Sequence, residues 1–297
     1  MDFPDILNFF GKKSRGVDTP NSSADLKPVE NMLKNISKAG QLSVDGSSYF
    51  PRAYSFPEWI TIAAEVNDPN AARTAIYYGF QPLYDLLIAG KLLPEQRETA
   101  VQSLNKVVNI GIIYLTGFYS GEPDIKSLRD KLSLLKQPLS ELAGAEYKLK
   151  PRNIDWNDIF PQDIHSFTLR YLEKILDGQA TKPDYIVGCA CGSSEIAMPL
   201  AGLLEVDLGF IRRSKRRGDN SPMVIEEHDS LLRKSSKGYN VLCVEDYVCS
   251  GRSLQKVMNK VAGYGAQRVE GVSLRNSREA DKLKLKLKER GLSLFSL

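Results

Sequence analysis

The sequence predicts an α/β fold in its C-terminal part, a parallel sheet wound with helices, preceded by a mainly helical region. Three observations lead to this prediction. After Gly178, short apolar runs rich in β-branched residues alternate with helical patterns, which is typical of βα units. Before Gly178, apolar residues recur at helical spacing. The 297-residue chain is also long enough to bury a sizeable core without covalent cross-links.

The N-terminal region divides into an arm and a helical domain. Residues 1–24 combine Gly, Pro, Ser, Asn and Lys with little periodicity, which indicates a mobile arm. Residues 25–180 form a mainly helical domain. Helices are expected to begin at Pro69 and Pro94, since Pro suits the first helical turn, and to cover 124–136, 138–147 and 161–176. The apolar run 107–118 is too short to cross a bilayer, so we expect a core helix.

We expect the α/β domain to cover residues 181–297. The apolar runs predict strands over 185–190, 208–211, 241–244, 269–274 and 292–297. The intervening patterns predict helices over 194–204, 253–264 and 278–290. Lys and Leu alternate through 282–288, so an edge strand is an alternative there.

The composition indicates the cellular compartment and the charge of the ligand. Four cysteines in a chain of this length do not resemble a disulfide framework, and the first residues lack the pattern of a leader peptide, so we expect a reducing, cytoplasmic protein without membrane association. Lys and Arg number 20 against 14 Asp and Glu in residues 181–297, but 20 against 22 in residues 1–180. The basic excess therefore lies in the C-terminal part, where it favours an anionic ligand.

The segment 241–254 carries the chemistry. An apolar strand delivers Glu245 and Asp246, and a loop with Ser250 and Gly251 then enters a helix. Ligands bind at this end of a parallel sheet, and amides at a helix N-terminus suit a phosphate. Two carboxylates beside a phosphate have a role if they accept hydrogen bonds from ribose hydroxyls, with a divalent cation screening the remaining charge. The segment thus predicts a sugar-phosphate site.

This segment resembles the phosphoribosyl pyrophosphate signature of type I phosphoribosyltransferases, and it is most similar to the hypoxanthine-guanine type. The resemblance implies that Glu245 and Asp246 bind the ribose hydroxyls and, through them, Mg²⁺. It also implies a 5-phosphate loop made of Cys249, Ser250, Gly251, Arg252 and Ser253. In the hypoxanthine-guanine type an aspartate acting as a base occupies the position of Cys249, whereas the orotate type has no acid there.

Two further elements follow the order of that family. Cys191, Gly192 and Ser193 come after a strand and resemble the loop that holds pyrophosphate. The basic run 212–217 resembles the strand end and lid that neutralise departing pyrophosphate through Arg213 and Lys215, with the lid reaching about residue 237 and including an exposed His228. Taken alone, such a run is also typical of a solvated loop or of a nucleic-acid contact. The cysteine spacings fit no common zinc pattern.

The resemblance implies an enzyme that binds magnesium phosphoribosyl pyrophosphate and transfers phosphoribosyl to a nitrogen acceptor, a base or a nucleotide-like molecule. Because little chain follows residue 274, the hood over the acceptor would come from the N-terminal helices. One alternative is a non-catalytic ligand sensor that binds nucleic acid or a protein partner through segment 212–217 and those helices. Another is an effector of a bacterial defence or toxin system that acts on nucleotides. A homodimer is the habit of the family.

Overall fold

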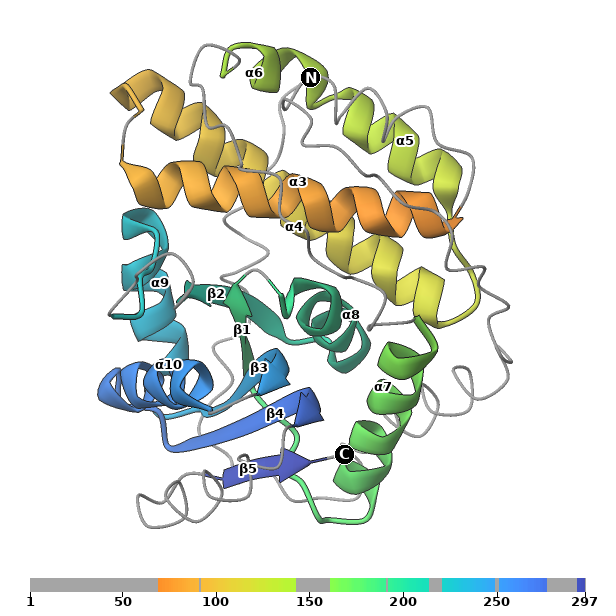
Figure 1. The fold of residues 1–297 in the computed structure, drawn as a ribbon, viewed down its shortest axis with the longest axis vertical. Helices are drawn as coiled ribbons and strands as arrows, with labels where there is room; N and C mark the ends of the chain where they lie inside the picture. Colours follow the sequence, from red (N-terminus) through yellow and green to blue (C-terminus); the bar gives the residue numbers. More distant parts are fainter. Residues whose placement is uncertain are drawn as a thin grey trace.

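The computed structural model describes residues 69–90, 92–142, 161–190, 192–213, 221–248, 251–276 and 293–296. Five parallel strands form one sheet in the order β2-β1-β3-β4-β5 (Figure 1). The strands are β1 (Tyr185–Ala190), β2 (Asp207–Arg212), β3 (Asn240–Val248), β4 (Arg268–Asn276) and β5 (Ser293–Ser296). The α/β prediction and the positions of its strands are therefore confirmed.

Strand β3 is longer than the sequence predicts. The apolar run ends at Val244, but the strand continues through Glu245 and Asp246 to Val248. Its ladder with β4 also continues, with Tyr247 opposite Arg275. Pairing with a neighbouring strand thus overrides the weak strand preference of two acidic residues. The two carboxylates consequently stand on an ordered strand instead of on a loose turn.

The helical region before the sheet is confirmed for the described residues. These helices are α3 (Pro69–Ala89), α4 (Pro94–Tyr119), α5 (Ile125–Ser133), α6 (Lys136–Ser140) and α7 (Pro161–Leu176). The helices that connect the strands are α8 (Ser194–Leu204), α9 (Glu226–Ser236) and α10 (Arg252–Gly263). The expected helix 138–147 is shorter on the described side, because α6 ends at Ser140. The expected arm 1–24 and helix 278–290 lie outside the described residues. The apolar run 107–118 is part of α4 and is largely buried, as expected for a core helix.

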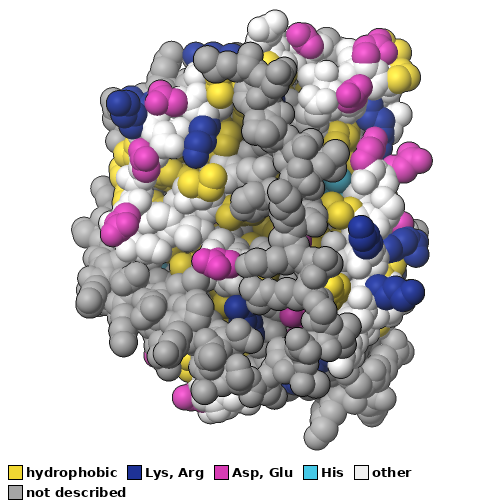
Figure 2. Space-filling model, turned by 180° about the vertical axis from the view of Figure 1, so that it is seen from behind, with side chains coloured by type: hydrophobic (Ala, Val, Ile, Leu, Met, Phe, Trp, Pro, Cys, Tyr) yellow, Lys and Arg dark blue, Asp and Glu magenta, His cyan; other side chains and the backbone are white. Residues whose placement is uncertain are grey.

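No helix in the described ranges has the length and apolar character needed to cross a bilayer. On the face seen in Figure 2, opposite to that of Figure 1, acidic and basic side chains intermingle, and several Lys and Arg side chains gather at the right-hand margin. A mixture of both signs of charge is typical of a surface that faces water.

Apolar side chains pack on both faces of the sheet. On one face α8 and α7 cover the sheet, and α3 and α4 pack beyond α8, so that a single buried cluster runs from Phe80 and Leu115 to Leu242 and Val272. On the other face α10 and α9 cover the strands, with Val257 and Leu232 fully buried. Burial on both faces explains why the strands are almost continuously apolar.

The prediction of a lid that reaches about residue 237 is wrong from Glu226 onward. This part of the chain forms α9, which lies in the connection from β2 to β3, and its Leu232 belongs to the core. His228 on this helix is half-buried and not exposed, and burial lowers its pKa. Residues 214–220 of the expected lid, with Lys215, lie outside the described residues.

Helix α3 is fixed to the edge strand β2 by two buried polar contacts. The Tyr84 hydroxyl donates a 2.7 Å hydrogen bond to the carbonyl oxygen of Phe210. The Asp85 carboxylate forms an ion pair with the Arg212 guanidinium, and both residues are at most 4% exposed. Arg212 therefore does not contribute to a basic surface, which corrects the expectation for segment 212–217 at its first residue.

Candidate phosphoribosyl site at the carboxyl edge of the sheet

The central feature of the site is the switch point at which two neighbouring strands, β1 and β3, separate. Strand β1 pairs with β3 only as far as Gly188 opposite Val244, although β1 pairs with β2 up to Ala190 and β3 pairs with β4 up to Val248. The chain moves from β1 outward to β2 and then crosses back to β3. Strand order thus reverses between β1 and β3, and open α/β sheets bind ligands at such a switch point.

The carboxyl groups of Glu245 and Asp246 stand on β3 directly after the point where β1 and β3 separate. Both residues are half-buried, and their carboxyl groups lie close enough to interact. Burial raises the pKa of Glu245, and the charge of Asp246 raises it further. The Cys189 thiol on β1 hydrogen-bonds to Glu245, and burial, together with that carboxylate, raises the pKa of Cys189. Cys189 is therefore a neutral thiol that supports the acidic pair, a role that no local sequence signal indicated.

Gly192, after β1, is in direct contact with Asp246. A Cβ atom on Gly192 would overlap the Asp246 carboxylate, so only glycine allows this close approach. Ser193 is fully buried, and its hydroxyl donates a 2.9 Å hydrogen bond to the carbonyl oxygen of Cys189. That bond fixes the turn from β1 into α8. The structure thus brings the expected pyrophosphate loop against the expected ribose-binding acid.

Replacing Gly192 with Ala is expected to weaken binding of the ligand that the sequence predicts, phosphoribosyl pyrophosphate, by roughly tenfold, because the new methyl group displaces Asp246. Isothermal titration of the variant measures this change. Gly263→Ala is the matched control, since the space around Gly263 is open and its backbone needs no positive φ. Equal affinity of Gly192→Ala and wild type would show that the contact between Gly192 and Asp246 has no role in binding.

The start of α10 carries the second group of expected site residues. Gly251 is buried, adopts the left-handed conformation with φ of 69° and is the N-cap of α10. Arg213, which follows β2, donates a 2.7 Å hydrogen bond from Nη1 to Oγ of Ser253 in the first turn of α10. The Arg213 guanidinium therefore lies beside the expected 5-phosphate loop. Arg252 of that loop is exposed.

The structure brings six of the expected site residues together in two groups, Gly192 with Glu245 and Asp246, and Arg213 with Gly251 and Ser253. Cys191, Lys215, Cys249 and Ser250 lie outside the described residues, so their expected roles stay predictions. The Arg213 Nε atom is buried and has no hydrogen-bond partner among the described residues. An anion at the start of α10 would give it one.

The acidic pair suits Mg²⁺. This ion prefers oxygen ligands and is usually held by one or two carboxylates together with substrate oxygens and water. The buried position of Glu245 next to Asp246, which raises the pKa of Glu245, leaves a carboxylate that a cation would stabilise. Within the described ranges no group of three or more His, Cys, Asp or Glu side chains could hold a metal without such help.

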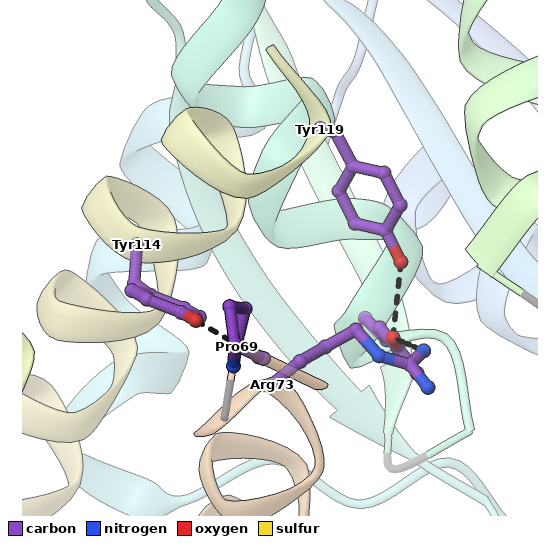
Figure 3. A network of polar contacts seen from close by, with 5 residues as sticks. Pro69, Arg73, Tyr114 and Tyr119 are labelled. Atoms are coloured by element: carbon purple, nitrogen blue, oxygen red, sulfur yellow. Dashed lines mark hydrogen bonds and ion pairs between the residues drawn. The ribbon is translucent and has the colours of Figure 1, made fainter. Parts of the chain in front are cut away.

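A polar network behind Gly192 was not expected from the sequence (Figure 3). Arg73 of α3 forms an ion pair with Glu195 in the first turn of α8. The Tyr119 hydroxyl of α4 donates a 3.0 Å hydrogen bond to the same Glu195 oxygen. A further bond of 2.8 Å joins the Tyr114 hydroxyl to the Pro69 carbonyl oxygen, which fixes the start of α3 on α4.

A parallel sheet with an acidic pair and two glycine-bearing loops at its switch point defines the C-terminal part of the chain as a phosphoribosyltransferase-type domain. Residues 158–294 match the family model of the phosphoribosyl transferase domain, so this part of the chain is similar to that family. The match begins before the sheet and includes α7.

Several solved structures are similar over less than half of this chain. The purine phosphoribosyltransferase of Pyrococcus horikoshii is 22% identical, over 41% of this chain and 77% of its own, with a TM-score of 0.33. The orotate phosphoribosyltransferase of Aeropyrum pernix is 23% identical, over 42% and 66%, with a TM-score of 0.32. The adenine phosphoribosyltransferase of Saccharomyces cerevisiae is 20% identical, over 46% and 79%, with a TM-score of 0.34. No curated protein matches the chain.

Proposed function

We propose that this protein binds magnesium phosphoribosyl pyrophosphate and transfers its phosphoribosyl group to a nitrogen acceptor, a base or a nucleotide-like molecule, with release of pyrophosphate. The observation that carries the proposal is the contact of Asp246 with Gly192 at the point where β1 and β3 separate. This contact puts a diol-binding acid beside an anion-binding turn. The 5-phosphate loop opens on the same edge, with Arg213 beside it.

The proposed roles follow from two groups of residues, one around Asp246 and the other at the start of α10. Glu245 and Asp246 accept hydrogen bonds from the ribose hydroxyls and fix the sugar ring. The amides at the start of α10, with Ser253 and Arg213, hold the 5-phosphate, because a helix N-terminus and a guanidinium both attract an anion. The turn made of Cys191, Gly192 and Ser193 holds the pyrophosphate, and Lys215 adds positive charge there.

The reaction breaks the bond between C1 of the ribose and the pyrophosphate oxygen, and the electron pair of that bond leaves with pyrophosphate. The nitrogen lone pair of the acceptor forms the new bond to C1 through an oxocarbenium-like state, and the acceptor proton passes to water. Mg²⁺, when bound, supplies positive charge to the phosphate oxygens. The protein contributes positioning and charge stabilisation, which together can supply most of the rate acceleration.

Titration of the full chain with phosphoribosyl pyrophosphate, with and without Mg²⁺, tests the binding step. We expect saturable binding that depends on Mg²⁺ and is weaker in Asp246→Asn. Pyrophosphate release is then followed with a panel of bases and nucleotides, one of which should support turnover. Binding without release by any acceptor would favour the ligand sensor over the enzyme. Absence of binding by the wild-type chain would rule out both.

The finer expectations on cellular context stay predictions. They are a cytoplasmic location, a homodimer and a nucleic-acid or protein partner for the N-terminal helices. For the basic segment, the burial of Arg212 against Asp85 removes that residue from the surface that such a partner could contact.

A further inference from the structure

We propose that Arg73 is a positioning residue for pyrophosphate, which acts by neutralising the Glu195 carboxylate directly behind the anion-binding turn. The inference rests on the proposed function, because it assigns the turn around Gly192 to pyrophosphate. It goes further in giving the N-terminal helices a defined task in substrate binding.

The geometry places a negative charge where it would hinder an anion. Glu195 lies in the first turn of α8, three residues after Gly192, and its side chain is only 12% exposed. A carboxylate at a helix N-terminus is favourable for the helix itself, since it faces the positive end of the helix dipole. It also occupies the same positive field that would otherwise attract pyrophosphate, and burial leaves its charge poorly screened by water.

Arg73 removes this conflict. Its guanidinium forms an ion pair with Glu195, and the Arg73 side chain is only 13% exposed. Tyr119 donates a hydrogen bond to the same carboxylate oxygen. The three side chains come from α3, α4 and α8 (Figure 3). The pair is close to neutral as a unit, so the amides after β1 keep their attraction for an anion. Without Arg73, Glu195 would remain as an uncompensated buried charge.

Close helix packing keeps this arrangement in place. A Cβ atom on Gly111 of α4 would overlap Met198 of α8, and one on Gly202 of α8 would overlap Thr116 of α4. The two helices therefore touch at short range along their length. Because Glu195 is in the first turn of α8, the packing of α8 on α4 fixes Glu195 relative to Tyr119.

The test compares three ligands that divide the site: Mg-pyrophosphate, phosphoribosyl pyrophosphate with Mg²⁺, and ribose 5-phosphate. In Arg73→Gln, titration calorimetry should give a Kd about tenfold higher for the two ligands that carry pyrophosphate. The Kd for ribose 5-phosphate should stay within about twofold, because that ligand uses the start of α10. The double variant Arg73→Gln with Glu195→Gln should recover most of the loss, since it removes both charges.

Arg97→Gln is the matched control, because Arg97 joins α4 to α9 through an ion pair with Glu227 on another part of the helical region. It should leave all three affinities unchanged. Tyr119→Phe keeps the ring and removes the hydroxyl that bonds to Glu195 and interacts with Arg73, so it should raise the Kd for pyrophosphate ligands by about threefold even if Arg73→Gln does not fold.

Two results would overturn the inference while leaving the proposed function intact. One is wild-type affinity for pyrophosphate ligands in both Arg73→Gln and Tyr119→Phe. The other is an equal loss for all three ligands that the double variant does not recover, which would indicate only a general loss of structure. If the wild-type chain binds none of the three ligands, the proposed function fails, and this inference fails with it.

Discussion

Replacing Asp246 with Asn is expected to lower kcat/KM for phosphoribosyl pyrophosphate by about a hundredfold. A hydrogen bond to a charged group contributes about 1.5–3 kcal/mol, and 1.4 kcal/mol corresponds to a factor of ten. Asp246 would accept such a bond from a ribose hydroxyl, and the variant would also bring an amide group against Gly192. Steady-state rates of pyrophosphate release measure the effect, and titration calorimetry shows how much of it lies in binding.

Asp207→Asn is the control for this prediction. Asp207 is also a half-buried acid of the sheet, but it stands at the start of β2. It therefore lies at the amino end of the parallel strands, whereas Asp246 lies near their carboxyl end. Its replacement should leave kcat/KM within about twofold of wild type. Comparable rates for Asp246→Asn and Asp207→Asn would mean that the acidic pair does not hold the substrate, and the proposed function would lose its central residue.

Replacing Asp85 with Ala is expected to lower the free energy of unfolding by about 3–5 kcal/mol. The change would remove the Asp85 carboxylate from the buried Arg212 guanidinium, whose residue is 4% exposed. Urea unfolding monitored by circular dichroism measures the loss. The double variant Asp85→Leu with Arg212→Met replaces the ion pair with apolar side chains, and it should recover most of the lost stability.

The Arg97 and Glu227 pair provides the comparison for that result. Its side chains are 24% and 37% exposed, so water screens their attraction. Arg97→Gln should therefore change the free energy of unfolding by less than about 1 kcal/mol. If Asp85→Ala cost no more than Arg97→Gln, the pair between α3 and β2 would not be a structural anchor.

Local sequence signals were sufficient for much of the fold. Strand β1 and helices α7 and α8 have the bounds that the apolar patterns predict. The error at α9 concerns a helix whose signal was present. Acidic residues fill its first turn, and Arg233 and Lys234 fill its last turn, as the helix dipole favours. The family comparison led us to expect a lid there, and that expectation outweighed the local signal.

In the site, residues of short motifs could be predicted from the sequence, whereas contacts between distant residues could not. Glu245, Asp246 and Gly192 were found because their chemistry lies in short motifs that follow strands. The partners of Arg73 and Arg213 could not be predicted in the same way, because each depends on how distant elements pack. Arg73 lies 122 residues from Glu195, and Arg213 lies 40 residues from Ser253. Such contacts leave no periodic signal along the chain.

The single buried cluster that joins α3 and α4 to the sheet bears on how this chain can be altered. Helix α8 lies between the strands and α4, so both of its sides are apolar, with Met198 and Leu200 inaccessible to water. A fragment that begins at the family match would present the outer side of α8 to solvent, and aggregation would be the consequence. The upstream helices are thus not an independent module that could be removed from the sheet.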